Sequence, residues 1–144
     1  MWSEELEKKA IAGDVCAMYD MGEAYRYGSG IEEDLEKAFH WYFRASQNYS
    51  ELKHCRRALF KVAECFRYGI GVAENKEEAF QYYLESAQYE YFHAQFEVAE
   101  FYRLGIGTEQ DFEEALYWYE RAEDNGCEFA KKRVKEMKTV LKLC

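Results

Sequence analysis

The stretch Tyr27-Gly28-Ser29-Gly30 returns twice in this sequence, as Tyr68-Gly69-Ile70-Gly71 and as Leu104-Gly105-Ile106-Gly107. Each copy follows an Arg, and an aromatic residue precedes that Arg. The three copies hold six of the nine glycines in the chain. Recurrence in one register is typical of tandem repeats, in which each unit forms one supersecondary structure and stacks on the next. The chain is therefore predicted to be a repeat protein.

The composition predicts that the repeats are helical. Apolar residues make up 49% of the 144 residues and aromatic residues 18%, which excludes an intrinsically disordered chain. Proline is absent, while Ala, Glu, Lys and Leu are plentiful, and this combination favours uninterrupted helices. The expected fold class is all-α, in a single domain large enough to bury a core.

Each repeat is expected to hold two helices, which we name helix A and helix B. Helix A ends at the first glycine of the pair, because glycine adopts the left-handed conformation that closes a helix, and the second glycine gives the loop another permissive point. Helix B starts at an Asp or Asn cap. In two repeats Glu78 or Glu114 follows the cap, which predicts a capping box in which the Glu carboxylate accepts from the cap amide. The glycines are Gly28, Gly69 and Gly105, then Gly30, Gly71 and Gly107, and the caps are Asp34, Asn75 and Asp111.

Helix B also carries a small residue where helices must approach closely, at Ala38, Ala79 and Ala115, with two aromatic residues one turn later. Gly28 and Gly69 lie 41 residues apart, whereas Gly69 and Gly105 lie 36 residues apart. Five additional residues near 47–53 are therefore expected to lengthen a turn or a helix. The predicted architecture is a right-handed α-solenoid of about eight helices. Its parts are a half-repeat at 1–13, repeats at 14–48, 54–89 and 90–126, and a C-terminal capping helix at 127–144.

The order of these residues resembles the SEL-like repeat, an α-solenoid relative of the tetratricopeptide repeat. The shared pattern is Ala, then Gly or Ala, an aromatic residue, Gly-x-Gly, the Asp or Asn cap, and Ala followed by two aromatic residues, over roughly residues 10–130. The departures are the insertion, Ala63 and Ala99 where the family usually has Gly, and the absence of the cysteine pairs of the secreted cysteine-rich branch. The resemblance implies a scaffold for protein–protein contacts, with bacterial members that act as adaptors or as partners of toxins and host proteins. The missing cysteine pairs speak against an extracellular or penicillin-binding role.

Helix A of each repeat is expected to line a concave groove, because the small rotation between stacked repeats curves a solenoid. Steps of about 100° per residue place one set of side chains opposite the core, where Glu23, Glu64 and Glu100 form an acidic ladder. We hypothesise that the groove binds a basic or amphipathic segment of a partner, with carboxylates that steer it and aromatic residues that anchor it. The predicted groove residues are Tyr19, Asp20, Glu23, Tyr27, Phe60, Lys61, Glu64, Tyr68, Phe96, Glu97, Glu100 and Leu104.

Two parts of this hypothesis have structural alternatives. The aromatic residues on the flank of helix A also suit packing between repeats. Each Glu of the ladder stands three residues before an Arg, so that these side chains also suit local salt bridges within one helix. The flank residues are Tyr19, Phe60 and Phe96, and the Arg residues are Arg26, Arg67 and Arg103.

The net charge of −9 disfavours binding to nucleic acid or to an anionic membrane surface. Residues 129–144 differ, with six basic side chains against one Glu, which suits a soluble capping helix or, as an alternative, a docking tail. The acidic N-terminal residues lack the pattern of a secretion signal, so a cytoplasmic protein is expected. The five cysteines show no repeated pairing and are expected to be reduced thiols.

No catalytic, cofactor or metal site is predicted. His40, His54 and His93 belong to different helices and lack the spacing of metal ligands. The Gly-x-Gly loops lack the third glycine and the preceding strand of a dinucleotide site. We therefore expect no cofactor and a non-enzymatic protein whose partner is another protein. Within that class a dedicated inhibitor of one toxin or enzyme is an alternative to an adaptor; an enzyme or an RNA-binding repeat protein is less favoured.

Overall fold

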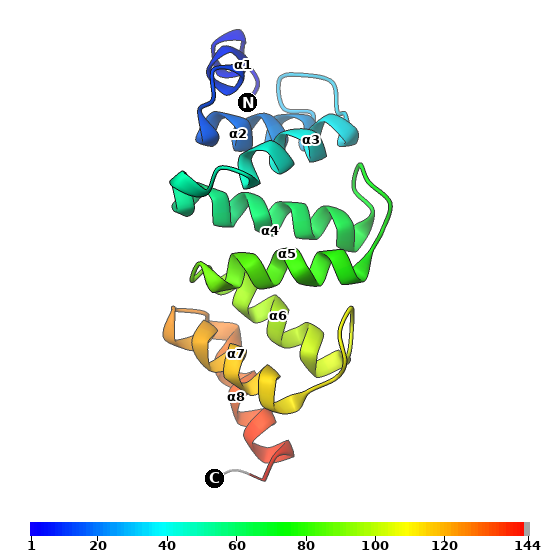
Figure 1. Ribbon diagram of the computed structural model, residues 1–144, viewed down its shortest axis with the longest axis vertical. Coiled ribbons are helices and arrows are strands. Elements are labelled where there is room, and N and C mark those ends of the chain that lie inside the picture. Colours follow the sequence, from blue (N-terminus) through cyan, green and yellow to red (C-terminus); the bar gives the residue numbers. More distant parts are fainter. Residues whose placement is uncertain (143–144) are drawn as a thin grey trace. The chain divides into compact units, whose positions relative to one another are not determined.

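The computed structural model describes residues 1–142, and this part of the chain has eight α-helices, one 3-10 helix and no strand (Figure 1). The all-α prediction and its sequential helix pairs are confirmed. Two predictions reach beyond the described residues. They are the last part of the C-terminal helix expected at 127–144 and the reduced thiol of Cys144. The elements are α1 (Glu4–Ile11), α2 (Val15–Tyr27), α3 (Leu35–Ser46), η1 (Tyr49–Glu51), α4 (Leu52–Tyr68), α5 (Lys76–Gln88), α6 (Phe92–Leu104), α7 (Phe112–Asp124) and α8 (Glu128–Val140).

The chain divides into two compact units, which are unit 1 at Met1–Asn75 and unit 2 at Lys76–Cys144. In unit 1, α2 packs against α1 and α3, and α4 packs against α3 and α2. In unit 2, α6 packs against α5 and α7, and α7 packs against α8. Helices that follow one another in the chain therefore stack side by side within each unit, which is the arrangement expected of a solenoid.

Local side chains or glycines set seven of the helix ends in the described chain. An oxygen of the cap side chain accepts a hydrogen bond from an amide of the first turn in α1, α2, α3 and α7. The C-caps of α2, α4 and α6 are left-handed, with φ of 63°, 68° and 67°. The N-caps are Ser3, Asp14, Asp34 and Asp111, and the C-caps are Gly28, Gly69 and Gly105.

The capping box predicted at Glu114 is wrong, whereas the one predicted at Glu78 stays a prediction. The amide of Asp111 donates to the carbonyl of Tyr102 at 2.9 Å, and the amide of Asn75 donates to that of Phe66 at 2.7 Å. The amide of Asp34 bonds to helix A of its own repeat in the same way. The cap amide thus ties the start of helix B to the last turn of helix A, so the Glu side chain is not needed to satisfy it.

The second glycine of each pair makes a close contact with the preceding repeat. A Cβ on Gly71 would lie 2.0 Å from the carbonyl oxygen of Leu35, and one on Gly107 would lie 2.4 Å from that of Lys76. Both residues have φ near 70°, at 70° and 67°. Only glycine fits such a site, because it combines a left-handed backbone with an approach that leaves no room for a side chain.

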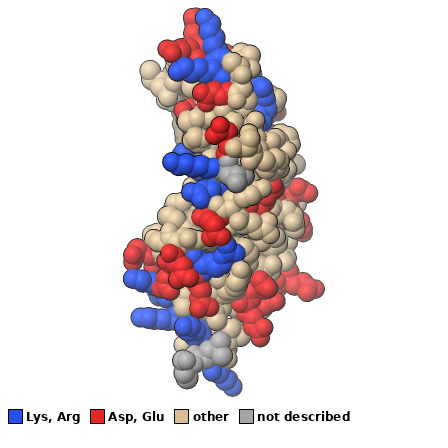
Figure 2. Space-filling view, turned by 60° about the vertical axis from the view of Figure 1, so that its left-hand side comes forward, with Lys and Arg blue, Asp and Glu red and all other residues tan. Residues whose placement is uncertain are grey.

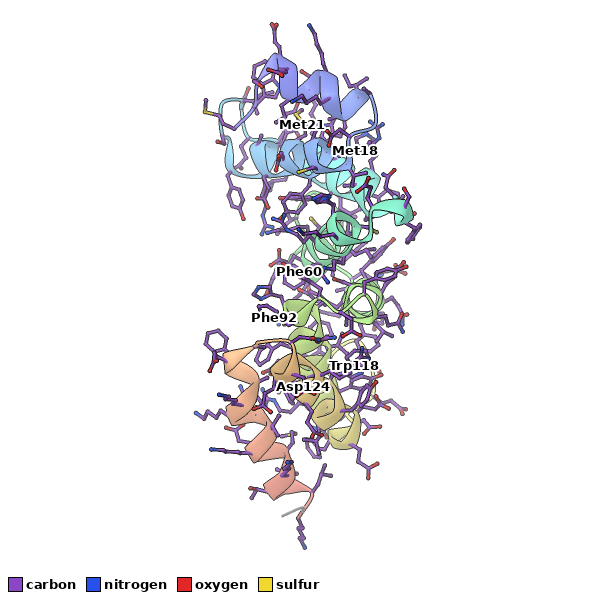
Figure 3. All side chains as sticks on the ribbon, turned by 90° about the vertical axis from the view of Figure 1, so that its left-hand side faces the viewer. Met18, Met21, Phe60, Phe92, Trp118 and Asp124 are labelled. Atoms are coloured by element: carbon purple, nitrogen blue, oxygen red, sulfur yellow. The ribbon has the colours of Figure 1, made fainter. Side chains whose placement is uncertain are left out.

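The core follows the predicted pairing of small and large residues in helix B. Ala38, Ala79 and Ala115 have no exposed surface. The second aromatic residue of each pair is at most 1% exposed, at Tyr42, Tyr83 and Tyr119. In repeat one the ring of Tyr42 lies against Gly22, where a Cβ would come within 2.6 Å of it. Met18 and Met21 of α2 complete this part of the core (Figure 3).

The five additional residues form η1 and lengthen α4. Helix α4 has 17 residues, whereas its counterparts α2 and α6 have 13 each. Of the cysteines in the described chain, Cys55, Cys65 and Cys127 are buried and Cys16 is exposed, all as free thiols. Burial raises the pKa of the Cys65 thiol to about 12, so this residue serves as a small apolar group.

Candidate protein-binding surface

Helix A of each repeat presents one large side chain to solvent just before its closing glycine. Tyr27, Tyr68 and Leu104 are exposed by 61%, 57% and 50%. Tyr25, by contrast, is buried. It precedes Tyr27 by two residues, and a rotation of about 100° per residue places the two side chains on opposite sides of α2. In unit 1 the guanidinium carbons of Arg26 and Arg67 lie 5.3 Å and 5.1 Å from the ring centres of the following tyrosines. The exposed rings are therefore held in place by neighbouring cations.

The flank aromatic residues take part in packing. The ring centre of Tyr19 lies 5.7 Å from that of Tyr42 and 4.4 Å from the guanidinium carbon of Arg57. Burial raises the pKa of the Tyr19 phenol above its ordinary range. In unit 2 Phe96 packs 5.6 Å from the ring of Tyr119. These positions thus fit the packing alternative, and Phe60 is half-buried.

The ladder carboxylates of unit 1 are engaged in ion pairs that link α2 and α4. Lys61 Nζ lies 3.4 Å from Glu23 and 3.6 Å from Glu64. Arg26 reaches across to Glu64 at 3.2 Å, which differs from the local pairing within one helix. Burial opposes the charge of Arg26, but the Glu64 carboxylate outweighs it and raises the pKa of the guanidinium. The pairs are partly shielded from water, where they are screened less than exposed ones.

Unit 2 repeats this arrangement between α6 and α8. Arg133 Nε lies 2.9 Å from Glu100, and its Nη1 lies 2.8 Å from Glu136. Arg133 thus joins a Glu of the preceding helix A to a Glu three residues further along its own helix, as Lys61 does in unit 1. Arg103 pairs with Glu100 at 2.5 Å, so the local alternative holds in this repeat. Arg103 also donates to the hydroxyl of Tyr119 at 3.1 Å.

The predicted acidic ladder is therefore a network of mixed charge. On the same side of α2 and α4, Asp20, Glu23 and Glu64 stand beside three basic side chains, Arg26, Arg57 and Lys61. Figure 2 shows acidic and basic side chains interspersed on the face in view. Exposed carboxylates that form no ion pair within the described residues gather instead where helix B begins. They include Glu32, Glu33 and Glu36 of unit 1, and Glu109, Glu113 and Glu114 of unit 2.

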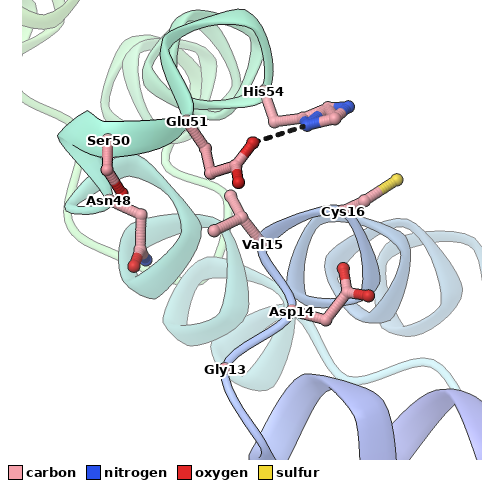
Figure 4. Close-up of a pocket in the computed structure, with 8 residues that line it drawn as sticks. All are labelled: Gly13, Asp14, Val15, Cys16, Asn48, Ser50, Glu51 and His54. Carbon is pink, nitrogen blue, oxygen red and sulfur yellow. Dashed lines mark ion pairs between the residues drawn. The ribbon is translucent and has the colours of Figure 1, made fainter.

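A polar pocket that the sequence analysis missed lies at the start of α2 and α4 in unit 1 (Figure 4). Its volume is about 500 Å³, and the insertion forms one wall. His54 Nδ1 lies 4.0 Å from the Glu51 carboxylate. Burial, followed by the charges of Asp20 and Asp14, raises the pKa of the Cys16 thiol, which disfavours the thiolate that a nucleophile requires. The displaced spacing of repeat two was the one signal of this pocket in the sequence.

The described residues form no group of three or more His, Cys, Asp and Glu side chains that could hold a metal ion. The three histidines belong to α3, α4 and α6. Among the described helices, none has the length and apolar character that crossing a bilayer demands. What the site offers is exposed aromatic and charged side chains on stacked helices, which suits contact with another macromolecule.

Three segments match the family model of the Sel1 repeat, at residues 17–50, 56–88 and 92–127. The chain belongs to the Sel1 repeat family. Sel1 repeats generally mediate protein–protein interactions, and the family is mostly non-enzymatic. No curated protein matches this Sel1 repeat chain significantly.

Solved structures show the same fold. A Sel1 repeat protein from Oxalobacter formigenes is 30% identical, with a TM-score of 0.81 over 92% of this chain and 96% of that one. The protein c5321, a protective antigen of uropathogenic Escherichia coli with an SLR fold, is 25% identical, with a TM-score of 0.85 over 93% of this chain. The Sel1 repeat chain covers 28% of c5321. Helicobacter pylori cysteine rich protein B is similar in fold alone, at 19% identity and a TM-score of 0.67, with 90% of this chain and 94% of that one covered.

Proposed function

We propose that this Sel1 repeat chain is a non-catalytic scaffold that binds a basic or amphipathic segment of a partner protein on the exposed side of its A helices. The observation that carries the proposal is the exposure of Tyr27 and Tyr68, at 61% and 57%, at equivalent positions of two stacked repeats in unit 1. Large aromatic side chains at the surface are the residues most enriched among binding hot spots.

The arginines beside these rings support the same role. Because Arg26 and Arg67 stack on Tyr27 and Tyr68, the rings lose little side-chain freedom when a partner covers them. The ion pair between Arg26 and Glu64 links the Tyr27 anchor of repeat one to helix A of repeat two. A preorganised pair of anchors favours a segment that spans both repeats.

The charge distribution supports a basic segment. The mixed ion pairs on the A helices leave little net charge beside the anchors, but the chain as a whole carries −9. Such a field draws basic segments toward the surface and raises the rate of association more than the final affinity. Selection by charge is therefore expected at long range, and selection by shape and apolar contact at the tyrosines.

Selection of peptides from a random displayed library tests this proposal, because the library samples many segment chemistries at once. We expect selected peptides to be rich in Lys, Arg and apolar residues. The double variant Tyr27→Ser/Tyr68→Ser should lose about 2 kcal/mol of binding free energy, about 30-fold in Kd. Tyr49→Ser, which removes a tyrosine that is 46% exposed elsewhere in unit 1, serves as the matched control. Selection of acidic peptides, or equal binding by both variants, would refute the proposal.

A further inference from the structure

Helix α8 presents a face of lysines that has no counterpart in the A helices α2, α4 and α6. Its buried side consists of Ala130, Val134 and Met137, which pack toward α7. The four lysines of the helix are all exposed, and at 100° per residue they fall within an arc of about 120°. We name this set the α8 lysine face. It consists of Lys131, Lys132, Lys135 and Lys138.

Comparison with α6 shows that this face departs from the repeat. Both helices have 13 residues, and Ala130, Val134 and Met137 take the places of Ala94, Val98 and Phe101. At two further positions α6 buries its side chains completely, whereas α8 exposes lysines. The two pairs are Gln95 with Lys131, and Ala99 with Lys135.

Three of these lysines carry uncompensated charge. Arg133 is paired with Glu136 of the same helix and with Glu100 of α6, and Lys131 Nζ lies 3.8 Å from Glu128. Lys132, Lys135 and Lys138 have no ion pair within the described chain. The face is thus available to an anionic partner.

Helix α7 carries an acidic face. Glu113, Tyr117, Glu120 and Asp124 are all exposed and fall within an arc of about 60°. We name this set the α7 acidic face; Asp124 lies at the C-terminal end of the helix (Figure 3). The hydroxyl of Tyr117 accepts a hydrogen bond from Arg121 at 3.0 Å, which holds the ring at the centre of the face.

This face also departs from the repeat. At the positions of Tyr117, Glu120 and Asp124, neither of the other B helices has an acidic residue. Helix α3 and its C-cap have His40, Phe43 and Gln47 there, and α5 has Gln81, Leu84 and Gln88. The two faces therefore occur together on the last two helices, and their charges are complementary.

We propose that the α8 lysine face of one copy packs along the α7 acidic face of a second copy. Along its helix axis the lysine face extends about 10 Å and the acidic face about 17 Å, so the whole lysine face fits within the acidic one. The exposed ring of Tyr117 adds an apolar contact at the centre. A long polyanion is disfavoured, because residues 129–144 carry +5 and the rest of the chain −14, which repels phosphates beyond α8.

Sedimentation of the full chain at rising concentration tests the contact. At about 20 mM NaCl we expect the average mass to rise with concentration above the 17.2 kDa of one chain, and at about 500 mM NaCl to stay there, because salt screens exposed charges. The α8 variant Lys135→Glu/Lys138→Glu and the α7 variant Glu120→Lys/Asp124→Lys should each remain monomeric. An equimolar mixture of the two should associate again, because the unaltered lysine face of the α7 variant can pack on the unaltered acidic face of the α8 variant.

A matched control separates this contact from a general effect of charge. Lys8→Glu/Lys53→Glu changes two exposed lysines of unit 1 and gives the same net charge as the α8 variant. It should associate as the unaltered chain does. Monomers at every concentration, equal loss in the control and the α8 variant, or a mixture that stays monomeric would each overturn the proposal. Binding of a labelled oligonucleotide that the α8 variant loses, without self-association, would assign the lysine face to nucleic acid instead.

Discussion

Replacement of Gly71 by Ala tests why the second glycine of the pair is needed. A Cβ at this position would lie 2.0 Å from the carbonyl oxygen of Leu35, 2.6 Å from its carbonyl carbon and 3.0 Å from the amide nitrogen of Glu36. All three atoms belong to the backbone at the start of α3, so no change of rotamer relieves the clash. The loop must instead move away from α3 by about 1.5 Å to reach an ordinary contact distance.

The expected cost has two parts. The left-handed backbone, at φ 70°, disfavours alanine by about 1 to 2 kcal/mol. The displacement adds about 1 to 3 kcal/mol, the usual cost of inserting an atom into a packed site. Gly71→Ala should therefore lower the free energy of unfolding by about 2 to 5 kcal/mol.

Gly69 provides the matched control. Its φ is 68°, but the nearest atoms to a Cβ there lie at 3.6 Å, an ordinary contact. Gly69→Ala should therefore cost only the backbone part, about 1 to 2 kcal/mol. Urea unfolding, followed by circular dichroism at about 222 nm, measures the free energy of unfolding of both variants, and one common denaturant slope is used for the two. If the two variants differ by less than about 0.5 kcal/mol, the close approach to α3 contributes nothing and the reasoning is refuted.

Three further predictions use the same unfolding assay. Asp111→Ala removes the acceptor of two amides in α7 and should cost about 1 kcal/mol, which Asp111→Ser should largely restore; an unchanged midpoint would contradict the cap. Gly22→Ala should destabilise by about 1 kcal/mol despite its gain in helix propensity, because the new Cβ would lie 2.6 Å from the ring of Tyr42; a gain in stability would show that the ring yields freely. Stability should be unaffected by Cys65 below pH 9.0 and should fall by about 1.4 kcal/mol per pH unit from there toward about 12, because the unfolded thiol ionises while the buried one stays protonated. Cys65→Ala should make that decline shallower, and an identical pH profile would refute the burial argument.

Much of the fold could be predicted from short-range patterns. Asp34 and Asp111 cap their helices because the acceptor lies two or three residues from the amides that it satisfies. Gly28 closes α2 because its own backbone geometry allows it. The capping box at Glu114 failed because the competing acceptor, the carbonyl of Tyr102, comes from the preceding helix. A local rule cannot anticipate a partner that the fold brings in from outside its window.

The candidate surface divides in the same way. The exposure of Tyr27 and Tyr68 follows from helical periodicity alone. The charge of the surface does not, since Glu64 takes part in a pair with Arg26, a residue 38 positions away. Nor does the pocket beside His54, whose walls come from the start of α2 and from the insertion before α4.

The sequence by itself determined the all-α class, the N-caps at Asp34 and Asp111 and the glycine ends of α2, α4 and α6, because each depends on residues within a turn or two of one another. It also determined the repeat register and the family, because the same local pattern recurs after 41 and 36 residues. Only the tertiary structure decided which cation neutralises each ladder carboxylate, and why Gly71 and Gly107 cannot carry a side chain. Those outcomes depend on backbone and charged groups that lie about 30 to 40 residues apart in the chain and meet only when consecutive repeats stack.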